Sequence, residues 1–460
     1  MSLGTGINTV DLVAAICFIL ALMGLSSPRW ARLGTLVGAL GMVLAVSFTF
    51  ATPGLSRFGL MIGAMAVGVV IGVPAARLVK MTAMPQMVAA FNGVGGGAAA
   101  LVALSEFLHA PAGSFATYQV IEALLGVIVG AVSFAGSVVA FAKLQELMTG
   151  RPITYPGQQA ANGIVALAIL GLSVATCVTP HTALLAIVGA VALLLGVAIV
   201  LPIGGADVPV LISLLNSFTG LAVAASGFVL HSVLLVVAGT LVGASGTILT
   251  RMMSQAMGRS LPNILFSAFG SVVEATGGGG GEARSVRSAS AEDIGVLLAY
   301  SRKVAIVPGY GLAVAQAQHV ARELVDLLES RGVEVLYAIH PVAGRMPGHM
   351  NVLLAEANVP YEQLKEMDEA NPEFSTTDVV LVIGANDVVN PAAKNSPGSP
   401  IYGMPILDVD EATHVIFMKR SMRPGFAGID NELLYNPKTT LLFGDAKDSL
   451  TALVGAVKRS

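Results

Sequence analysis

The 460-residue chain is long enough for several domains, but only 12% of it is charged and 55% is hydrophobic, a composition typical of membrane proteins. Its formal net charge of −3, without a basic stripe, argues against a nucleic-acid partner. Both cysteines, Cys17 and Cys177, lie inside apolar runs, so we expect neither a disulfide framework nor a metal site.

Charged residues are concentrated in the C-terminal part of the chain. Residues 1–270 hold 9 of the 25 Lys and Arg residues and 5 of the 28 Asp and Glu residues. Two solvents are therefore implied, lipid for the first part and water for the second. We expect an all-α membrane domain at 1–265, a flexible linker with five consecutive glycines at 266–293, and a soluble domain at 294–460.

The membrane domain contains nine apolar runs close to bilayer length, which predict nine transmembrane helices. The N-terminus lacks the basic region of a secretory signal, so the first run is expected to remain as a span. Eight of the nine basic residues in this part fall on the side of the C-terminal domain and only Arg57 falls on the other, which predicts a cytoplasmic C-terminal domain and an external N-terminus. The runs lie near 9–25, 33–50, 58–76, 84–106, 119–142, 160–178, 182–203, 208–230 and 232–250.

Three polar residues within the spans are candidates for a proton path, because a polar group in lipid is costly. Asn92 lies in the fourth run, and Asp207 and Asn216 open and line the eighth. A satisfied hydrogen bond between helices is the plainer explanation for each of them. Glycine pairs at four-residue spacing predict close helix packing at Gly68–Gly72, Gly126–Gly130 and Gly239–Gly243.

Short apolar strands alternate with helical segments after residue 294. This alternation predicts an α/β, doubly wound, Rossmann-like parallel sheet. The strands are expected at 303–308, 333–340, 378–384, 414–420 and 440–444, with helices at about 312–330 and 446–458.

A glycine-rich turn follows the first of these strands. Gly309, Tyr310 and Gly311 precede a helix, at the place where a dinucleotide fold turns past a pyrophosphate. Val314 replaces the third glycine of the usual fingerprint, and for the motif alone a tight turn without a ligand is an equally good explanation. His340 ends the second strand where Asp or Glu would hold the ribose of NAD, so the domain either prefers NADP or binds its nucleotide differently.

Two cations and a hydroxyl stand at the end of the fourth predicted strand. Lys419, Arg420 and Ser421 suit a 2′-phosphate, although solvated surface charge would be the better explanation if they stood alone. Asp387 is a carboxylate near the expected nicotinamide end. Turn residues at other strand ends favour a shared ligand at this edge of the sheet, at 342–347, 384–387 and 444–447.

Several long motifs resemble the β subunit of the proton-translocating NAD(P) transhydrogenase. They include GYGLAVAQAQ at 309–318, GANDVVNPAAK at 384–394 and IYGMPILDV at 401–409, and the membrane segments MPQMVAAFN and DVPVLISLLNSFTG match the family too. The resemblance implies reversible hydride transfer between NAD(H) and NADP(H), coupled to proton movement across a bacterial cytoplasmic membrane. Nine spans is the number that the family has in this subunit.

The resemblance also implies site residues by position. Asp207 and Asn216 match family positions thought to matter for coupling, whereas Asn92 stands where many relatives carry a channel histidine. Because Asn does not titrate near neutral pH, the titrating group must then lie elsewhere. NADP(H), in the reverse of the usual orientation, is expected to contact Gly309, Tyr310, Gly311, Val342, Ala343, Gly344, Arg345, Met346, Pro347, Gly384, Ala385, Asn386, Asp387, Gly403, Met404, Lys419, Arg420, Ser421, Met422, Arg423, Pro424, Gly425, Phe426, Asp445 and Ala446.

Hydride transfer between two nicotinamides needs a second dinucleotide-binding domain, because this chain offers only one. We expect NAD(H) on a partner α subunit, membrane lipid around the spans, and a dimer of αβ units. Protonation in the membrane would change how the soluble domain holds NADP(H), with Asp387 and His340 as sensors. A channel or transporter that senses a nucleotide, and a purely structural nucleotide-binding scaffold, are the alternatives.

Overall fold

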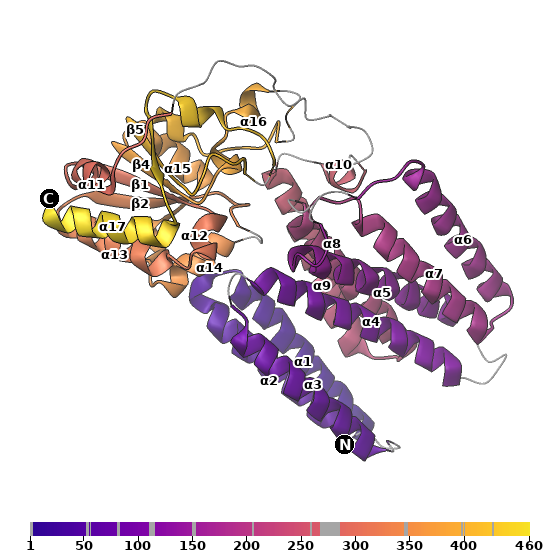
Figure 1. The fold of residues 1–460 in the computed structure, drawn as a ribbon. Coiled ribbons are helices and arrows are strands. Elements are labelled where there is room, and N and C mark those ends of the chain that lie inside the picture. The colour runs from indigo at the N-terminus through magenta and orange to yellow at the C-terminus, as the bar shows by residue number, and fades with distance from the viewer. Residues whose placement is uncertain are drawn as a thin grey trace. The chain divides into compact units, whose positions relative to one another are not determined.

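The computed structural model forms two compact units, Met1–Thr250 and Arg251–Ser460, and each is described by itself (Figure 1). The predicted glycine-rich tether around 277–281 lies outside the described residues. The structure describes residues 3–51, 55, 57–80, 83–109, 116–149, 153–204, 207–257, 260–266, 286–344, 348–396, 399, 401–425 and 427–460.

Nine long helices make up the first unit, and each overlaps one of the nine predicted runs. Over the described residues, eight of them are long and apolar enough to cross a membrane, and the first contributes a shorter apolar stretch, Thr9–Leu25. The prediction of a polytopic helical bundle is thus confirmed. The helices are α1 (Leu3–Leu25), α2 (Pro28–Thr49), α3 (Phe58–Leu78), α4 (Met84–His109), α5 (Thr117–Leu144), α6 (Gln158–Val178), α7 (Thr182–Val200), α8 (Val208–Val229) and α9 (Val233–Ala256).

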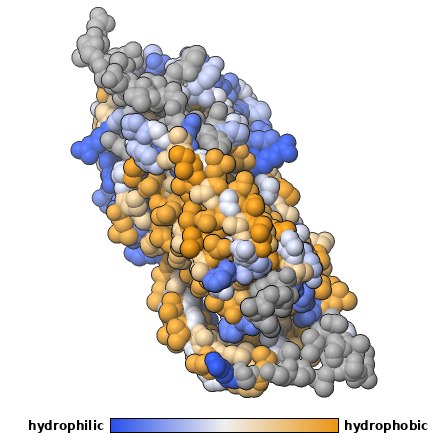
Figure 2. Space-filling view, turned by 90° about the vertical axis from the view of Figure 1, so that its right-hand side faces the viewer, coloured by the Kyte–Doolittle hydropathy of each residue, from blue (hydrophilic) through white to orange (hydrophobic). Residues whose placement is uncertain are grey.

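The helices differ sharply in how much of their surface is covered. Helices α5 and α8 are the most buried of the spans, whereas α3 has no buried residue. Large apolar side chains cover much of the outer surface of the helices, as lipid-facing helices require (Figure 2). The core of this unit therefore lies around α5 and α8, between α4 and α7.

Glycines allow two of the predicted close contacts between helices. A Cβ atom on Gly130 would lie 2.6 Å from the carbonyl oxygen of Gly96, and one on Gly239 would lie 2.4 Å from the amide nitrogen of Ala224. Gly68 and Gly72 behave differently, because no described atom lies within 4 Å of a Cβ built on either of them. The packing prediction holds for α5 and α9 and is wrong for α3 within this chain.

The second unit is built on a six-stranded, fully parallel sheet with strand order β3-β2-β1-β4-β5-β6, the Rossmann order (Figure 1). Five of the strands match the predicted ones to within one residue at each end. The sixth, β3, has only three residues and was not predicted. The strands are β1 (Lys303–Pro308), β2 (Glu334–Ile339), β3 (Leu364–Glu366), β4 (Val379–Ile383), β5 (His414–Lys419) and β6 (Thr439–Phe443).

Each face of the sheet has its own hydrophobic core, because side chains alternate between faces along a strand. Val304 and Ile306 pack on one face against the helices α11, α13, α14 and α17, while Ala305 and Val307 pack on the other against α15 and short 3-10 turns. Continuous apolar runs such as KVAIVP are explained by this two-sided burial. The helices of this unit are α10 (Leu261–Phe266), α11 (Ala291–Ala299), α12 (Tyr310–Val314), α13 (Gln318–Ser330), α14 (His349–Glu356), α15 (Met367–Phe374), α16 (Ala392–Asn395) and α17 (Ala446–Arg459).

The single helix predicted at about 312–330 is in fact two helices, α12 and α13. Helix α12 ends in a left-handed turn at Gln316, with a φ of 50°. There the amide of Ala317 donates to the carbonyl of Leu312 at 3.2 Å, and the amide of Gln316 donates to that of Ala313 at 3.1 Å. This is a Schellman ending with glutamine in the place that glycine usually takes, so no glycine marked the break in the sequence.

Candidate functional site

The carboxyl ends of the parallel strands meet at one edge of the sheet, and most predicted site residues lie there. Gly309 follows β1, His340 follows β2 and Gly384 follows β4, while β5 ends at Lys419 and Gly444 follows β6. The order of the strands reverses between β1 and β4, which is where open α/β sheets bind ligands. The topology thus brings together turns that are up to 135 residues apart in sequence, from 309 to 444.

The turns after β1 and β4 pack directly on each other through glycine. The amides of Gly309 and Gly311 donate to the carbonyls of Ile383, at 2.9 Å, and Gly384, at 3.0 Å. A Cβ atom on Gly384, whose φ is +69°, would lie 2.4 Å from the Cα atom of Gly311. Any side chain at these positions would therefore push the two turns apart. The amides of both glycines are used within the protein, which favours the tight-turn explanation for this pair of residues.

Asn386 and Asp387, in the turn after β4, hold the segment that follows β5. The Asp387 carboxylate accepts hydrogen bonds from Asn386 Nδ2 at 2.9 Å and from the Ala427 amide at 2.8 Å. A Cβ atom on Gly425 would lie 2.5 Å from Asp387 Oδ1, so glycine is needed for this close approach. Asn431 Nδ2 donates to the carbonyl of Asn386 at 3.1 Å. Gly425, Ala427 and Asn431 are thus held against the β4 turn, with Asp387 as the acceptor for Ala427.

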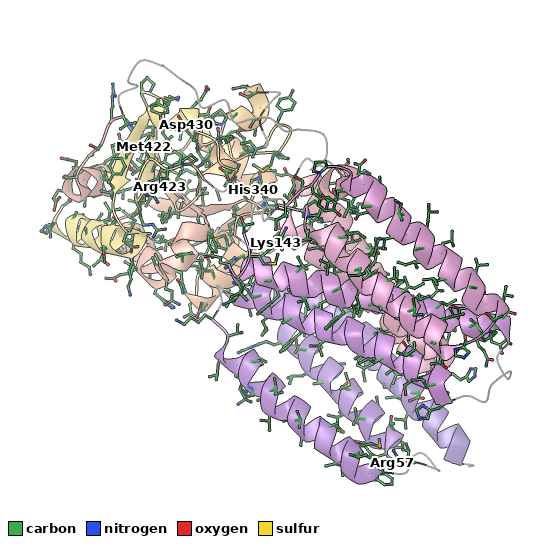
Figure 3. All side chains as sticks on the ribbon, turned by 45° about the vertical axis from the view of Figure 1, so that its right-hand side comes forward. Arg57, Lys143, His340, Met422, Arg423 and Asp430 are labelled. Atoms are coloured by element: carbon green, nitrogen blue, oxygen red, sulfur yellow. The ribbon has the colours of Figure 1, made fainter. Side chains whose placement is uncertain are left out.

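Lys419 lies half-buried at the end of β5, with its ammonium group directed at the same turn. Its Nζ donates to Asn386 Oδ1 at 3.0 Å. Burial lowers the pKa of Lys419 from its usual value, and the nearby carboxylates of Asp430 and Asp387 oppose that shift. The neighbouring Arg420, Ser421 and Arg423 are exposed, and Figure 3 marks Arg423 and Asp430 within this segment. A partly desolvated cation with exposed arginines beside it is a suitable place for a phosphate.

His340 is held in its neutral form by its surroundings (Figure 3). Its side chain is 1% exposed, Nδ1 accepts a hydrogen bond from the Val342 amide at 3.2 Å, and Nε2 lies 2.8 Å from the carbonyl of Pro405. These contacts place the proton on Nε2. Burial is the main reason that the pKa of His340 is lowered to about 4, while the bond to Pro405 opposes that shift. Such a group stays neutral through the physiological range, which favours a structural role.

The remaining predicted nucleotide contacts surround this edge. Tyr310 lies edge-on to His349, with ring centroids 6.2 Å apart, and Gly344 has a φ of +106° that brings it against the His349 ring. Met404 is buried beside Ile401 and Ile406, next to Gly403, and Asp445 caps α17 by accepting the Lys447 amide at 2.9 Å. Four predicted contacts lie outside the described residues: Arg345, Met346, Pro347 and Phe426.

The chemistry of the described edge fits a phosphate-bearing nucleotide better than a metal. It offers a half-buried lysine, exposed arginine and serine side chains, and turns that only glycine can form. Among the described residues no group of three His, Cys, Asp or Glu side chains is placed to hold a metal ion.

In the membrane unit, Asn92 lies in a buried network between α4, α5 and α8. Asn92 Nδ2 donates to Ser137 Oγ at 2.9 Å and to Ser133 Oγ at 3.4 Å. Ser133 Oγ in turn bonds to the carbonyl of Leu215 at 2.8 Å and to Thr219 Oγ1 at 2.7 Å. The Oδ1 atom of Asn92 is buried and has no hydrogen-bond partner among the described residues. The plainer explanation, a hydrogen bond between helices, thus holds for the amide nitrogen and leaves one acceptor for water.

The other two predicted proton-path residues belong to α8 and its N-terminal cap. Asp207 is buried at the N-terminus of α8, and Asn216 is half-buried one residue after Leu215. Ser133, Ser137 and Thr219 were not singled out from the sequence, because serine and threonine are common in spans. The four-residue spacing of the two serines, which puts both on one face of α5, was the available signal.

Comparison with known proteins gives one consistent result. Residues 7–456 match the family model described as the NAD(P) transhydrogenase beta subunit. Two relatives from Rhodospirillum rubrum, each named NAD(P) transhydrogenase subunit beta, are 50% identical over 455 residues, which cover 97% of this chain and 98% of theirs.

Proposed function

The chain belongs to the NAD(P) transhydrogenase β-subunit family, and on that premise we propose that it is the NADP(H)-binding subunit of a proton-translocating transhydrogenase. It would exchange hydride reversibly with NAD(H) held by a partner α subunit and couple that exchange to proton translocation. The observation that carries the proposal is the sheet edge, where Lys419 and the glycine turns of β1 and β4 lie together, in a chain that also carries a bundle of apolar spans.

The sheet edge supplies binding and orientation, while the nicotinamide cofactors supply the hydride chemistry when bound. Lys419, Arg420 and Ser421 would hold the 2′-phosphate, and Tyr310 and the segment 342–347 would line the rest of the site. Gly403, Met404, Asp445 and Ala446 would complete the lining. No nucleophilic side chain is required, because the two cofactors react with each other.

A partner is part of the proposal because the described residues contain one Rossmann-order sheet. Hydride transfer requires two nicotinamides in near contact, so the NAD(H)-bearing domain must dock at the carboxyl edge of this sheet. We propose a dimer of αβ units as the complete assembly.

Asp387 is the better placed of the two proposed sensors. As a carboxylate it accepts the Ala427 amide at 2.8 Å, whereas a protonated carboxyl group would be a weaker acceptor. Protonation would therefore loosen the segment 425–431 and open the edge for nucleotide exchange. His340 has both ring nitrogens engaged, so a sensor role for it would require those two bonds to break.

In the membrane we propose that Asn92, Asp207 and Asn216 line the proton path. The unpartnered Oδ1 atom of Asn92 supports a water molecule at that point. Because Asn92 itself does not titrate near neutral pH, a group on the partner's helices would carry the proton there.

The proposed setting is a bacterial cytoplasmic membrane, with the soluble domain inside and the N-terminus outside. Basic residues support this orientation, since Arg57 and Lys143 lie at opposite ends of the helices (Figure 3). The functional division would then be a membrane domain at 1–265, a linker at 266–293 and an NADP(H) domain at 294–460.

Reconstitution tests the proposal directly. The chain is placed in lipid vesicles with a candidate NAD(H)-binding subunit, and NADPH formation is followed together with internal pH. We expect hydride transfer accompanied by proton movement that an uncoupler abolishes. A nucleotide-sensing channel would instead move protons without any hydride transfer, and a structural scaffold would do neither.

A further inference from the structure

Lys143, at the C-terminal end of α5, is a buried lysine inside the helical bundle (Figure 3). Only 4% of its surface is exposed, although lysine is almost never fully buried unless its charge is satisfied. By sequence it was only one of the eight basic residues that orient the spans. Its surroundings therefore call for a separate explanation.

The ammonium group of Lys143 caps the end of a different helix, α7. Its Nζ donates to the carbonyl oxygens of Val200 at 3.2 Å, Leu201 at 2.6 Å and Ile203 at 2.7 Å. An ammonium group has three protons, so these three bonds use all of them. The C-terminus of a helix carries partial negative charge and unpaired carbonyls, and a cation there is favourable.

Two further groups donate hydrogen bonds to the same end of α7, so this end is held from several sides. Gln158 Nε2, from α6, donates to the carbonyl of Ala198 at 3.3 Å. The amide of Ile153 donates to the carbonyl of Leu201 at 3.1 Å. Lys143 differs from both because it alone reaches Ile203, beyond the end of the helix.

Ile203 precedes Asp207, the N-cap residue of α8, by four positions in the sequence. The amide of Asp207 donates to the carbonyl of Gly204, next to Ile203, at 3.0 Å, and the carbonyl of Asp207 accepts the Leu211 amide at 3.1 Å. Lys143 therefore fixes the backbone from which Asp207 and α8 begin. Helix α8 in turn carries Leu215 and Thr219, which bind Ser133 beside Asn92.

We propose that Lys143 is a positioning residue for proton coupling: by holding the carbonyls of Leu201 and Ile203, it sets the place of Asp207 and the register of α8 against the Asn92 network. The inference rests on the proposed function, since it concerns the coupling of the same reaction. Lys143 lies in the membrane unit and is not among the residues proposed to hold NADP(H), so its loss should separate proton movement from hydride transfer.

The test uses the full chain with its NAD(H)-binding subunit in vesicles and compares Lys143→Met, Lys143→Arg and Gln158→Leu. Methionine has a similar length without donors, and we expect it to lower the number of protons moved per hydride about tenfold. Arginine keeps the donors and should restore most of the coupling. Gln158→Leu removes one bond to the same helix end without touching Ile203 and should stay close to wild type.

NADPH binding to the full chain is measured alongside, and we expect it to change less than about twofold in all three variants, because no coupling to nucleotide affinity is required of this lysine. If Lys143→Met does not assemble in the membrane, Lys143→Gln, which keeps donors on a shorter side chain, is assayed in the same way and should give a partial loss. The inference is overturned if Lys143→Met, or Lys143→Gln where that variant replaces it, moves as many protons per hydride as wild type. It is also overturned if Gln158→Leu loses as much proton movement per hydride as the Lys143 variant. Absence of hydride transfer in wild type would instead overturn the proposed function.

Discussion

In the sheet unit the candidate functional residues lie at the ends of strands, whereas in the membrane unit they lie along the middle and at the ends of helices. Asp387 stands in a turn beside which Gly425 is needed for close approach, and Lys419 ends β5 and donates to Asn386 in that turn. Asn92 and Ser133 stand inside regular helices, where no break in the backbone marks them. A turn is visible in a sequence, but a contact between two helices is not.

The two units also satisfy their polar groups differently. At the sheet edge a carboxylate or lysine is paired with backbone amides and an asparagine within the same few turns. In the bundle, partners come from helices up to 127 residues away, as in the bond between Ser226 and the carbonyl of Ala99. Single substitutions at the edge should therefore act locally, while those in the bundle should act between helices.

The first prediction concerns the glycine contact between the β1 and β4 turns. Gly384→Ala adds a Cβ atom 2.4 Å from the Gly311 Cα atom at a φ of +69°. Gly332→Ala is the matched control, because Gly332 has a φ of +84° but open space around it. We expect Gly384→Ala to cost about 1–3 kcal/mol more than the control, the range for overpacking. Hydrogen exchange of the β1 and β4 amides in the full-length chain measures this, and equal protection in both variants would contradict the contact.

His340 gives the second prediction, which tests whether the edge contains a titrating group. Unfolded histidine has a pKa near 6.5, whereas burial lowers the pKa of His340 to about 4 in the folded protein. Between those values the unfolded chain binds a proton that the folded chain does not, so this contribution to stability is present above pH 6.5 and is lost as the pH falls toward 4. The loss amounts to about 3 kcal/mol for a shift of this size.

NMR of histidine-labelled protein, with His340→Gln to identify the signal, measures this pKa. Titration of the folded protein near pH 6.5 would contradict the two hydrogen bonds assigned to the ring. It would also restore His340 as a sensor beside Asp387.

Much of the fold was predictable because its elements have strong periodic signals. The nine spans and five strands follow from apolar runs whose length matches the bilayer or a buried strand. The missed features lack such a signal. The strand β3 has three residues, Leu364–Glu366, and the break between α12 and α13 depends on Gln316 taking a left-handed conformation that glycine usually takes.

The candidate site was predictable in position and less so in detail. The turns at 309–311, 384–387 and 419–421 were expected at one edge and lie there, because parallel strands align their carboxyl ends. The sequence did not indicate that Gly309 and Gly311 use their amides on the β4 turn, or that Lys143 caps α7, since both depend on partners distant in sequence. Family motifs supplied residue identities but not these contacts.

The third prediction concerns whether Lys419 binds a phosphate or only holds the β4 turn. Lys419→Ala should weaken NADPH binding about 10- to 100-fold, the usual effect of losing a charged hydrogen bond, and leave NADH binding nearly unchanged. Lys438→Ala is the control, because Lys438 donates to the carbonyls of Asp410 and Ala412 away from this edge. Calorimetry on the full chain gives both affinities. If the affinities for NADPH and NADH fell equally, Lys419 would only hold Asn386 in the β4 turn and would not bind the 2′-phosphate.

The smallest effect on stability should come from a substitution in the helical bundle. It tests whether polar groups there act between helices. Ser137→Ala removes the acceptor 2.9 Å from Asn92 Nδ2 and leaves Ser133 at 3.4 Å as the remaining one. Hydrogen bonds between membrane helices contribute about 0.6 kcal/mol on average, so the melting temperature should fall only slightly. Proton movement per hydride should fall more than stability if Asn92 must be held in one orientation to bind water. Ser173→Ala is the control, because the one bond of Ser173 to a described residue goes to the carbonyl of Ile169 within its own helix. Equal behaviour of the two variants in proton movement would mean that the network is packing alone, and that the membrane unit places its proton path elsewhere.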